Sequence, residues 1–467
     1  MPQMPLPSRR RTQHAVLIVV LATYMMIILD TSIVITGLPE IRDGLGFSPT
    51  GLSWVQNAYT LSFGGFMLLG ARAGDVLGRR RVYLAGLAVF LLASAVIGLA
   101  PSAGVLLIAR AVQGAGAAVL APTTLSLLTI HFAEGEERNR ALAQYAAAAG
   151  IGSSLGLVLG GVFAGWISWR VGFLVNVPVA GVLYWAAARL LQRHPGTGGR
   201  LDISGAILST LGMAGLVYGI VRSATAGWTD PVTLGTIATG LALIAAFLIA
   251  QRRRANPLLP LRLFASRERV GAYLARMMFL GAMVSFFFFS TQLMQGELHL
   301  TPVQAGVGFL PVTVLTFLAS LSLPRLVRAF SNGPVLIAAF LAIALGLVWL
   351  AQASLDGCYL DAVAAPMLLI GIGNGLGLSP LTAAAMRGVA PEEAGAASGL
   401  VNVAHQLGGT LGLATLITVF AAAMRGVSPP EAALAQGIVA GLHGAAALAG
   451  LGGMISLALI RPAECRR

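Results

Sequence analysis

A single carboxyl group lies inside the first long apolar stretch of the chain. Asp30 falls in the segment MIILDTSIVI, and the run from Ala15 to Leu38 is otherwise uncharged. Because a charged group in apolar surroundings costs free energy, it is expected to face a cavity and to have a function. A carboxyl group in such a place can take up a proton in one conformation and release it in another. The alternative is a structural hydrogen bond to a neighbouring helix.

Three further ionisable residues lie within or at the ends of apolar stretches. Arg110 begins RAVQGAGAA, and a guanidinium there normally turns to a polar interior; the alternative is that it reaches the membrane surface. Glu297 lies near the end of its stretch, where a position at the rim is an equal alternative. His405 titrates near neutral pH, with a packing role as its alternative. Asp30, Arg110, Glu297 and His405 are therefore candidate proton-coupling residues.

Other polar, aromatic and thioether side chains in these stretches are candidates for lining a binding cavity. Gln113 lies one turn after Arg110, and Asn402 and Gln406 lie near one helical face with His405. The four phenylalanines at 286–289 cover a whole helix circumference, so some of them must face outward. The candidate substrate-binding residues are Asp30, Met26, Asn57, Tyr59, Gln113, Gln144, Tyr145, Phe286, Phe289, Asn374, Asn402 and Gln406.

The composition places these residues in a membrane. Of the 467 residues, 57% are hydrophobic and 10% are charged, with a mean hydropathy of +0.83, whereas a soluble domain is about one quarter charged. Apolar runs long enough to cross the hydrocarbon core are helical, because only helices satisfy their backbone internally. We count fourteen such runs, which predicts an all-α integral membrane protein with 14 transmembrane helices.

The arginines predict the orientation. All 30 basic residues are arginine; with the N-terminus inside, 24 fall in inside loops and tails, four in outside loops and two within helices. Basic residues concentrate in cytoplasmic loops, so both termini are expected in the cytoplasm of a bacterial cell, with the chain in its cytoplasmic membrane. The net charge of +13 is explained by topology, and no nucleic acid is expected as a partner.

A weak internal repeat divides the chain. GAGAAVLAP from Gly114 and GNGLGLSP from Gly373 each hold a Gly-x-Gly, a proline and, further on, an acidic pair. Equivalent segments of the same orientation indicate two parallel halves. We expect six-helix bundles at 1–195 and 257–467, joined by two inserted helices at 196–256.

Two segments have features of conformational gating. In ARAGDVLGRR, a glycine permits a tight turn, an aspartate can cap a helix or pair with a guanidinium, and arginines lie at the lipid surface; a plain basic loop is the alternative. In the fifth stretch, glycines four residues apart share a face and allow close helix contact, either as static packing or as a seam on which helices rock. The candidate gating residues are Asp75, Gly78, Arg79, Arg80, Gly152, Gly156 and Gly160.

Together these segments resemble the major facilitator superfamily, in particular its fourteen-helix drug:proton antiporter branch. LDTSIVITGLP (29–39) is similar to that branch's first-helix signature, ARAGDVLGRR (71–80) to the superfamily loop motif and RAVQGAGAA (110–118) to its fourth-helix motif. WRVGFLVNVPVA (169–180) and PLLPLRLF (257–264) resemble further family blocks. The resemblance implies a proton-coupled exporter of hydrophobic or amphiphilic small molecules, such as antibiotics, that works by alternating access. It also implies a role for Asp30 in coupling and in recognising cationic substrates.

The chain departs from the family pattern in two places. The antiporter motif of the fifth helix has Gly-Pro where this chain has Gly156-Leu157, and the loop motif has Ala71 and Val76 in place of a glycine and a basic residue. The missing proline leaves open a uniporter or an uptake symporter of the same fold. A non-transporting membrane sensor is a third alternative.

The expected partners are the lipid bilayer and small hydrophobic or cationic substrates. An enzyme is not expected, because scattered histidines and one mid-membrane acid supply neither a nucleophile with its base nor a metal site. No cofactor or metal is expected, and the proton is the coupling ion. The two cysteines, Cys358 and Cys465, fall on opposite sides of the expected topology and so form no bridge. We expect a monomer.

Overall fold

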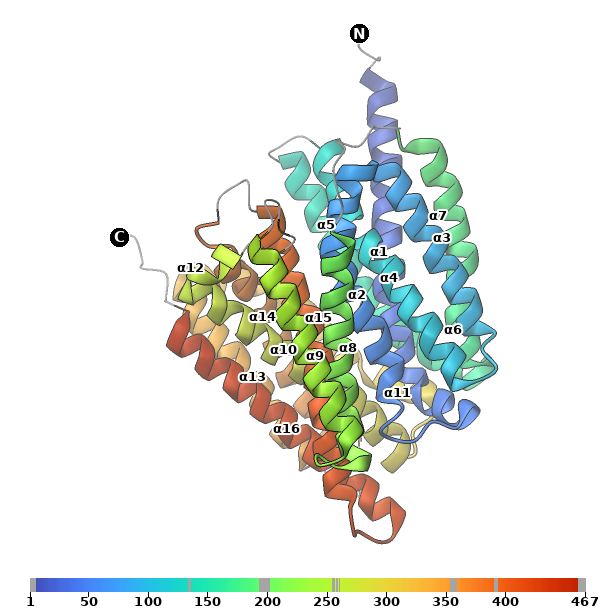
Figure 1. Cartoon of the computed structure of the whole chain (residues 1–467), viewed down its shortest axis with the longest axis vertical. Helices are drawn as coiled ribbons and strands as arrows, with labels where there is room; N and C mark the ends of the chain where they lie inside the picture. Colours follow the sequence, from blue (N-terminus) through green and yellow to red (C-terminus); the bar gives the residue numbers. More distant parts are fainter. Residues whose placement is uncertain are drawn as a thin grey trace.

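The computed structural model describes residues 6–132, 136–192, 202–253, 257, 259, 261–352, 359–389 and 394–460, and these contain helices and no strand (Figure 1). The helices of the first part are α1 (Leu6–Leu45), α2 (Ser53–Leu77), α3 (Arg79–Gly98), α4 (Ala103–His131), α5 (Glu136–Val162), η1 (Phe163–Ile167), α6 (Trp169–Leu174) and α7 (Asn176–Leu190). Then follow α8 (Ile203–Ala226), α9 (Pro231–Arg253) and η2 (Leu261–Ala265). The last part holds α10 (Arg267–Gln292), η3 (Leu293–Glu297), α11 (Pro302–Gly308), α12 (Leu310–Phe330), α13 (Asn332–Ala351), η4 (Leu360–Ala364), α14 (Ala365–Met386), α15 (Ala394–Met424) and α16 (Pro430–Leu459).

The outer surface of the bundle is apolar. Large hydrophobic side chains such as Leu92, Ile108 and Leu457 are 63%, 69% and 70% exposed, which suits contact with lipid tails rather than water. Within the described residues, twelve helical stretches are long and apolar enough to cross a membrane. The sequence predicted fourteen. The polar residues of α2 keep it below this hydropathy, and the apolar stretch Ile151–Ile167, which runs from α5 into η1, is too short.

The helices group into two bundles. In the first, α2 packs on α4, α1 on α5, and α3 on α4 and α7. In the second, α10 packs on α15 and α16, and α14 packs on α12 and α13. Helices α8 and α9 pack on each other, and α8 also contacts α2 and α15, one helix from each bundle. Figure 1 shows this pair, in green, in front of the line where the blue and orange-to-red helices meet. Residues 195, 196 and 256 at the expected boundaries 195/196 and 256/257 lie outside those described.

The two bundles contact each other near α11 and between α2 and α15. A Cβ atom at Gly306 of α11 would lie 2.6 Å from the Leu157 carbonyl oxygen of α5, and Gly161 is similarly close to Pro302. Farther along the interface, the Thr60 and Thr410 hydroxyls of α2 and α15 are 2.8 Å apart. The glycine contacts close the space between the bundles at the α11 end.

The predicted glycine seam lies on α1. A Cβ atom at Gly156 would be 2.6 Å from the Ser32 Cβ, Gly160 lies against the Ile33 carbonyl, and Gly152 also contacts α1. Only residues without a Cβ allow this approach of α5 to α1. The contact is with a helix of the same bundle, as static packing requires.

The loop motif forms the turn between α2 and α3. Gly78 has a φ of +93°, which only glycine adopts without strain. Arg80 Nη2 donates to the Ala188 carbonyl at 2.6 Å and so caps the C-terminus of α7, where positive charge is favoured. Arg79 is also bonded, and the side chain of Asp75 is outside the described residues.

Candidate functional site

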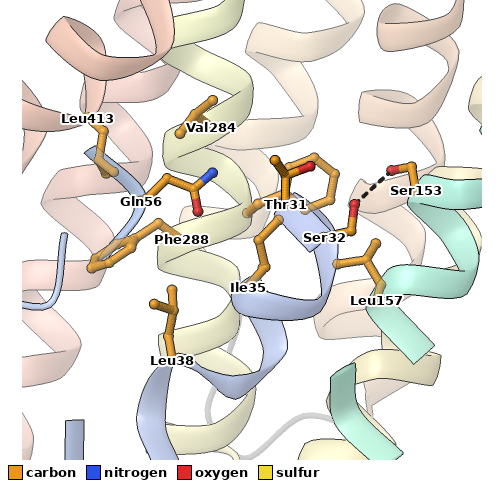
Figure 2. Close-up of a pocket in the computed structure, with 11 residues that line it drawn as sticks. Thr31, Ser32, Ile35, Leu38, Gln56, Ser153, Leu157, Val284, Phe288 and Leu413 are labelled. Carbon is orange, nitrogen blue, oxygen red and sulfur yellow. Dashed lines mark hydrogen bonds between the residues drawn. The ribbon is translucent and has the colours of Figure 1, made fainter. Parts of the chain in front are cut away.

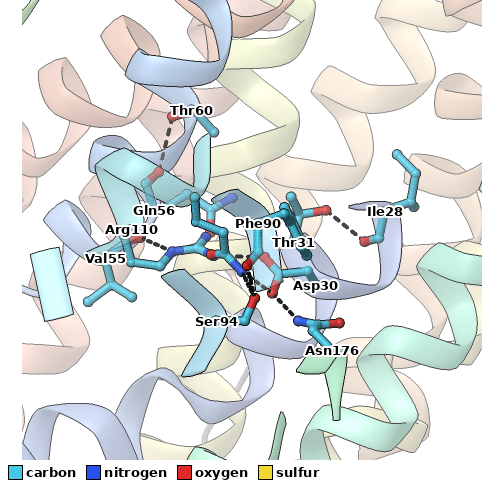
Figure 3. Close-up of polar contacts among 11 residues, drawn as sticks. Ile28, Asp30, Thr31, Val55, Gln56, Thr60, Phe90, Ser94, Arg110 and Asn176 are labelled. Carbon is cyan, nitrogen blue, oxygen red and sulfur yellow. Dashed lines mark hydrogen bonds and ion pairs between the residues drawn. The ribbon is translucent and has the colours of Figure 1, made fainter. Parts of the chain in front are cut away.

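Asp30 lies in an enclosed polar cluster at the centre of the first bundle (Figure 3). Arg110 Nη1 is 2.8 Å from Asp30 Oδ2, and both side chains are 1% exposed. Gln113 Nε2 and Asn176 Nδ2 donate to Asp30 Oδ1 at 2.9 and 2.6 Å. Four helices therefore contribute to the cluster: α1 supplies the carboxylate, α4 and α7 supply the donors, and α3 supplies Ser94, whose hydroxyl accepts from Gln113 Nε2 at 2.8 Å.

Arg110 has further partners that fix its direction. Its Nε donates to the Val55 carbonyl at 3.1 Å, and its Nη1 also donates to Gln113 Oε1 at 2.6 Å. The guanidinium carbon lies 4.3 Å from the Tyr59 ring centroid and 5.6 Å from that of Phe173, within cation–π range. Arg110 thus faces the interior of the bundle and does not extend to the membrane surface.

The cluster is built to hold one negative charge. Removing a charged pair from water costs several kcal/mol per ion, and the cost is offset only when the remaining donors and acceptors are also bonded. Here the carboxylate accepts three hydrogen bonds. A proton arriving at Asp30 would remove the charge that holds Arg110, which makes the pair a natural two-state element.

A cavity of about 160 Å³ lies beside this cluster, between the bundles (Figure 2). Its α1 wall includes Thr31 and Ser32, the two residues that follow Asp30. The lining side chains come from α1, α2, α5, α10 and α15: Thr31, Ser32, Ile35, Leu38, Gln56, Ser153, Leu157, Val284, Phe287, Phe288 and Leu413. Most are apolar, with a few hydroxyls and one amide, as is typical of sites for hydrophobic small molecules.

The phenylalanines of α10 that line the cavity are not the two that were predicted to do so. Phe286 and Phe289 were expected at the binding site, but both are fully buried in the second bundle. The Phe289 ring packs 5.7 Å from that of Phe420. Phe287 and Phe288 line the cavity instead, because the packing of α10 on α15 and α16 turns the other two rings inward.

His405 forms a second polar cluster, in the second bundle. Arg276 Nη2 lies 3.2 Å from His405 Nδ1, and Arg276 Nη1 donates to Thr382 Oγ1 at 2.8 Å. Since arginine is only a donor, His405 Nδ1 must accept, so its proton is on Nε2. A second proton on His405 would break this bond and place two positive charges together. This arrangement disfavours His405 as a proton-coupling residue.

The other candidates are distributed over the molecule. Glu297 is the last residue of η3, is half-buried and has an interaction partner. Met26 is buried in the first bundle, and Asn57 and Tyr59 are fully buried, with the Asn57 amide atoms and the Tyr59 hydroxyl unbonded within the described structure. Gln144 is exposed.

Four of the remaining candidates are half-buried. The Tyr145 ring stacks on Tyr24 with centroids 3.8 Å apart. Asn374 Nδ2 donates to Thr316 at 3.2 Å and ties α14 to α12, Asn402 is bonded, and Gln406 packs against Gly64 of α2. None of the polar and aromatic candidates other than Asp30, Arg110, Gln113 and Tyr59 belongs to the Asp30 cluster as described.

Several residues of these sites were not predicted. Asn176 is the one amide in the apolar block WRVGFLVNVPVA, and an amide side chain in such a block could have been predicted to belong to a polar site. Arg276 was recognised as lying within a helix but was given no role. Ser94, Gln56 and Thr31 are common residue types whose position on the helix face decides their role. Within the described residues, no group of three or more His, Cys, Asp or Glu side chains could hold a metal.

Comparison with known proteins places the chain in a family. The family model described as "Major Facilitator Superfamily" matches residues 20–413. The cephamycin export protein CmcT of Amycolatopsis lactamdurans is 41% identical over 88% of this chain and 86% of its own length. The puromycin resistance protein pur8 of Streptomyces alboniger is 39% identical over 86% and 81%.

Solved structures agree on the fold. The nucleoside transporter NupG aligns with a TM-score of 0.62 at 12% identity, over 96% of this chain and 99% of that one. A tetrameric PepTSo2 aligns with a TM-score of 0.64 at 16% identity, over 97% and 98%. The superfamily predicted from the motifs is confirmed, and this chain belongs to the Major Facilitator Superfamily.

Proposed function

We propose that this protein exports antibiotic-like small molecules across the cell membrane by proton antiport. Its relatives include proteins named for cephamycin export and for resistance to puromycin and lincomycin. The direction from inside to outside follows those names. Two bundles that meet around a cavity are suited to alternating access.

The proposed topology has fourteen crossings. Helix α2 lies against α4, and α5 lies against α1 over much of its length, so both accompany helices that cross. The polar residues of α2 face the interior and so do not prevent insertion. With α8 and α9 as the inserted pair, the bundles span residues 1–195 and 257–467. Both termini are cytoplasmic in this scheme, in a bacterial membrane, and the protein acts as a monomer.

The single observation that carries the proposal is the enclosed Asp30–Arg110 pair beside the cavity. Protonation of Asp30 would neutralise the carboxylate and leave Arg110 with the Val55 carbonyl and the Gln113 amide. The neighbouring Thr31 and Ser32 form part of the cavity wall, so a movement of α1 at Asp30 changes the shape of the cavity. Proton binding and substrate binding are thereby coupled through one helix.

The proton gradient is sufficient for useful export. One charge that crosses the membrane contributes about 2.3 kcal/mol per 100 mV, and about 1.4 kcal/mol corresponds to a tenfold ratio. One proton therefore supports roughly fortyfold accumulation of a neutral substrate. The cavity of about 160 Å³ is smaller than sites for drug-sized ligands, which are about 300–1,000 Å³. We infer that it widens in another state of the cycle.

The test uses purified protein in liposomes with an imposed pH gradient and a dye that reports internal pH. Puromycin, lincomycin or a cephamycin is added to wild type, to Asp30→Asn and to the control Asp43→Asn. Asp43 lies on the same helix but is 68% exposed. Proton movement triggered by a compound in wild type and the control, and abolished in Asp30→Asn, is the expected result. Proton movement that persists in Asp30→Asn would exclude Asp30 as the coupling site, and no movement with any compound would exclude antiport of these compounds.

A further inference from the structure

Arg276 is a buried cation with no anion among its described contacts. Its side chain is 7% exposed, nine residues into α10. Its contacts are the Thr382 hydroxyl at 2.8 Å and the His405 ring at 3.2 Å, both uncharged. Among the described residues, no carboxylate contacts it, and its Nε has no partner. By contrast, Arg110 at similar burial has Asp30.

An uncompensated charge of this kind is costly. A buried arginine is normally paired, and an unpaired one costs several kcal/mol in a low-dielectric interior. A residue retained despite that cost is expected to have a function. Of the five N–H groups of a guanidinium, only two have a partner here. The unbonded Nε and a second N–H on a neighbouring nitrogen form the fork that suits a carboxylate or phosphate oxygen pair.

The side chains around Arg276 are partly accessible. Thr382 and His405 are half-buried, and so is Tyr24 of α1, whose hydroxyl is within electrostatic range of the guanidinium. Tyr24 belongs to the first bundle, and α1 contacts α10, so Arg276 lies on the part of α10 that is near the first bundle. The His405 Nε2–H is one more donor beside it, because Nδ1 is used as the acceptor.

Arg276 also lies on the cavity side of α10. Residues 276 and 287 are eleven positions apart, about three helical turns, and so share one face. Phe287 lines the cavity, and Arg276 lies about 16 Å nearer the start of α10 along that face. The start of α10 is the end expected to face the cytoplasm.

We propose that Arg276, oriented by His405 and Thr382, binds the anionic group of substrates that carry a carboxylate, on their route from the cytoplasm to the cavity. This rests on the proposed export function and adds a substrate class to it. The apolar body of the substrate then contacts the face that leads to Phe287. Cationic compounds gain nothing from this site.

The test measures binding, which is independent of proton movement. Purified full-length protein is titrated with a cephamycin and with its methyl ester, which lacks the negative charge. Wild type is expected to bind the carboxylate at least tenfold more tightly than the ester. Arg276→Gln should abolish that preference, and Arg276→Lys should keep part of it. The control Arg425→Gln, at an arginine that donates to the Ala224 carbonyl, should leave it unchanged.

Two results would overturn the proposal: equal binding of acid and ester by wild type, or equal weakening of both by Arg276→Gln. If Arg276→Gln does not fold, the same binding preference is measured with Thr382→Val, which removes a partner that orients Arg276. A reduced preference supports the site, and an unchanged preference contradicts it. If the preference for the carboxylate depends on Arg276 but no compound causes proton movement in liposomes, the anion site stands and only the proposed antiport is overturned. If puromycin causes proton movement but wild type does not prefer the carboxylate to the ester, the antiport stands and the anion site is overturned.

Discussion

Arg110 Nη1 lies 2.8 Å from Asp30 Oδ2, with both side chains 1% exposed, so an ion pair between α1 and α4 is sealed inside one bundle. The two residues are 80 positions apart in the chain, and each would be unfavourable alone in this environment. The contributions of Asp30 and Arg110 to the stability of the fold are therefore strongly coupled.

Asp30→Asn and Arg110→Met should each destabilise the protein by about 3–5 kcal/mol, because each leaves a buried charge without its partner. The double variant should be markedly more stable than the sum of the two losses implies, because no charge remains. It should still fail to couple proton movement to export. Unfolding in detergent, followed for all four proteins, gives the interaction energy. If the losses of stability in the two single variants add up to the loss in the double variant, Asp30 and Arg110 are not energetically coupled.

Cross-linking α2 to α15 should stop transport. The Thr60 and Thr410 hydroxyls are 2.8 Å apart across the bundle interface, so cysteines at both positions in a background without Cys358 and Cys465 are close enough to form a disulfide. Oxidation should block export by fixing the two bundles, and a reducing agent should restore it. Each single-cysteine variant under the same oxidant serves as the control. Full export by the cross-linked protein would exclude separation of the bundles at this point.

Gly306→Ala should open the α11 end. The new Cβ would lie 2.6 Å from the Leu157 carbonyl oxygen, so α11 and α5 must move apart. A thiol introduced by Ser153→Cys, on the cavity wall, should then react several-fold faster with a membrane-impermeant maleimide added from outside. Gly450→Ala is the matched control, because nothing lies within 4 Å of that Cβ. Equal labelling rates in the two variants would mean that this contact does not close the outer side.

The loop between α8 and α9 should stabilise the protein in a pH-dependent way. Hydrogen bonds from Arg222, and then from the Thr233 backbone, lower the pKa of Asp230 from 3.8 to about 2. A pKa that is lower in the folded state gives stability that is present above about pH 4 and is lost as the pH falls toward 2. Asp230→Asn should therefore melt at a slightly lower temperature than wild type at pH 6.

The difference in melting temperature should shrink between pH 4 and pH 2.5, measured in detergent. Because the side chains of Arg222 and Asp230 are 33% and 19% exposed and so partly screened by water, the effect is small. Asp43→Asn, at an exposed acid beside Arg42, provides the comparison. A difference that is constant with pH would assign the effect to the helix cap at Thr233 and not to the charge of Asp230.

The sequence was informative where one physical quantity decides the answer. Apolar runs must be helical in lipid, so hydropathy located nearly all of the helices. The φ of +93° at Gly78 was predictable because the loop motif needs a residue without a Cβ. By contrast, the count of crossings was uncertain where helices carry polar interior faces, as α2 does with Gln56 and Asn57.

The sequence by itself determined that Asp30 and Arg110 must avoid lipid, because no charge is stable there without a partner. Only the tertiary structure decided that they pair with each other, and that Asn176 joins them, because contacts between distant helices depend on how each helix is rotated. The same rotation placed Phe287 and Phe288 at the cavity and Phe286 and Phe289 in the core. It also left Arg276 with no carboxylate contact among the described residues. Hydrophobic patterning specifies that a helix is buried, and packing against its neighbours specifies which face meets the site.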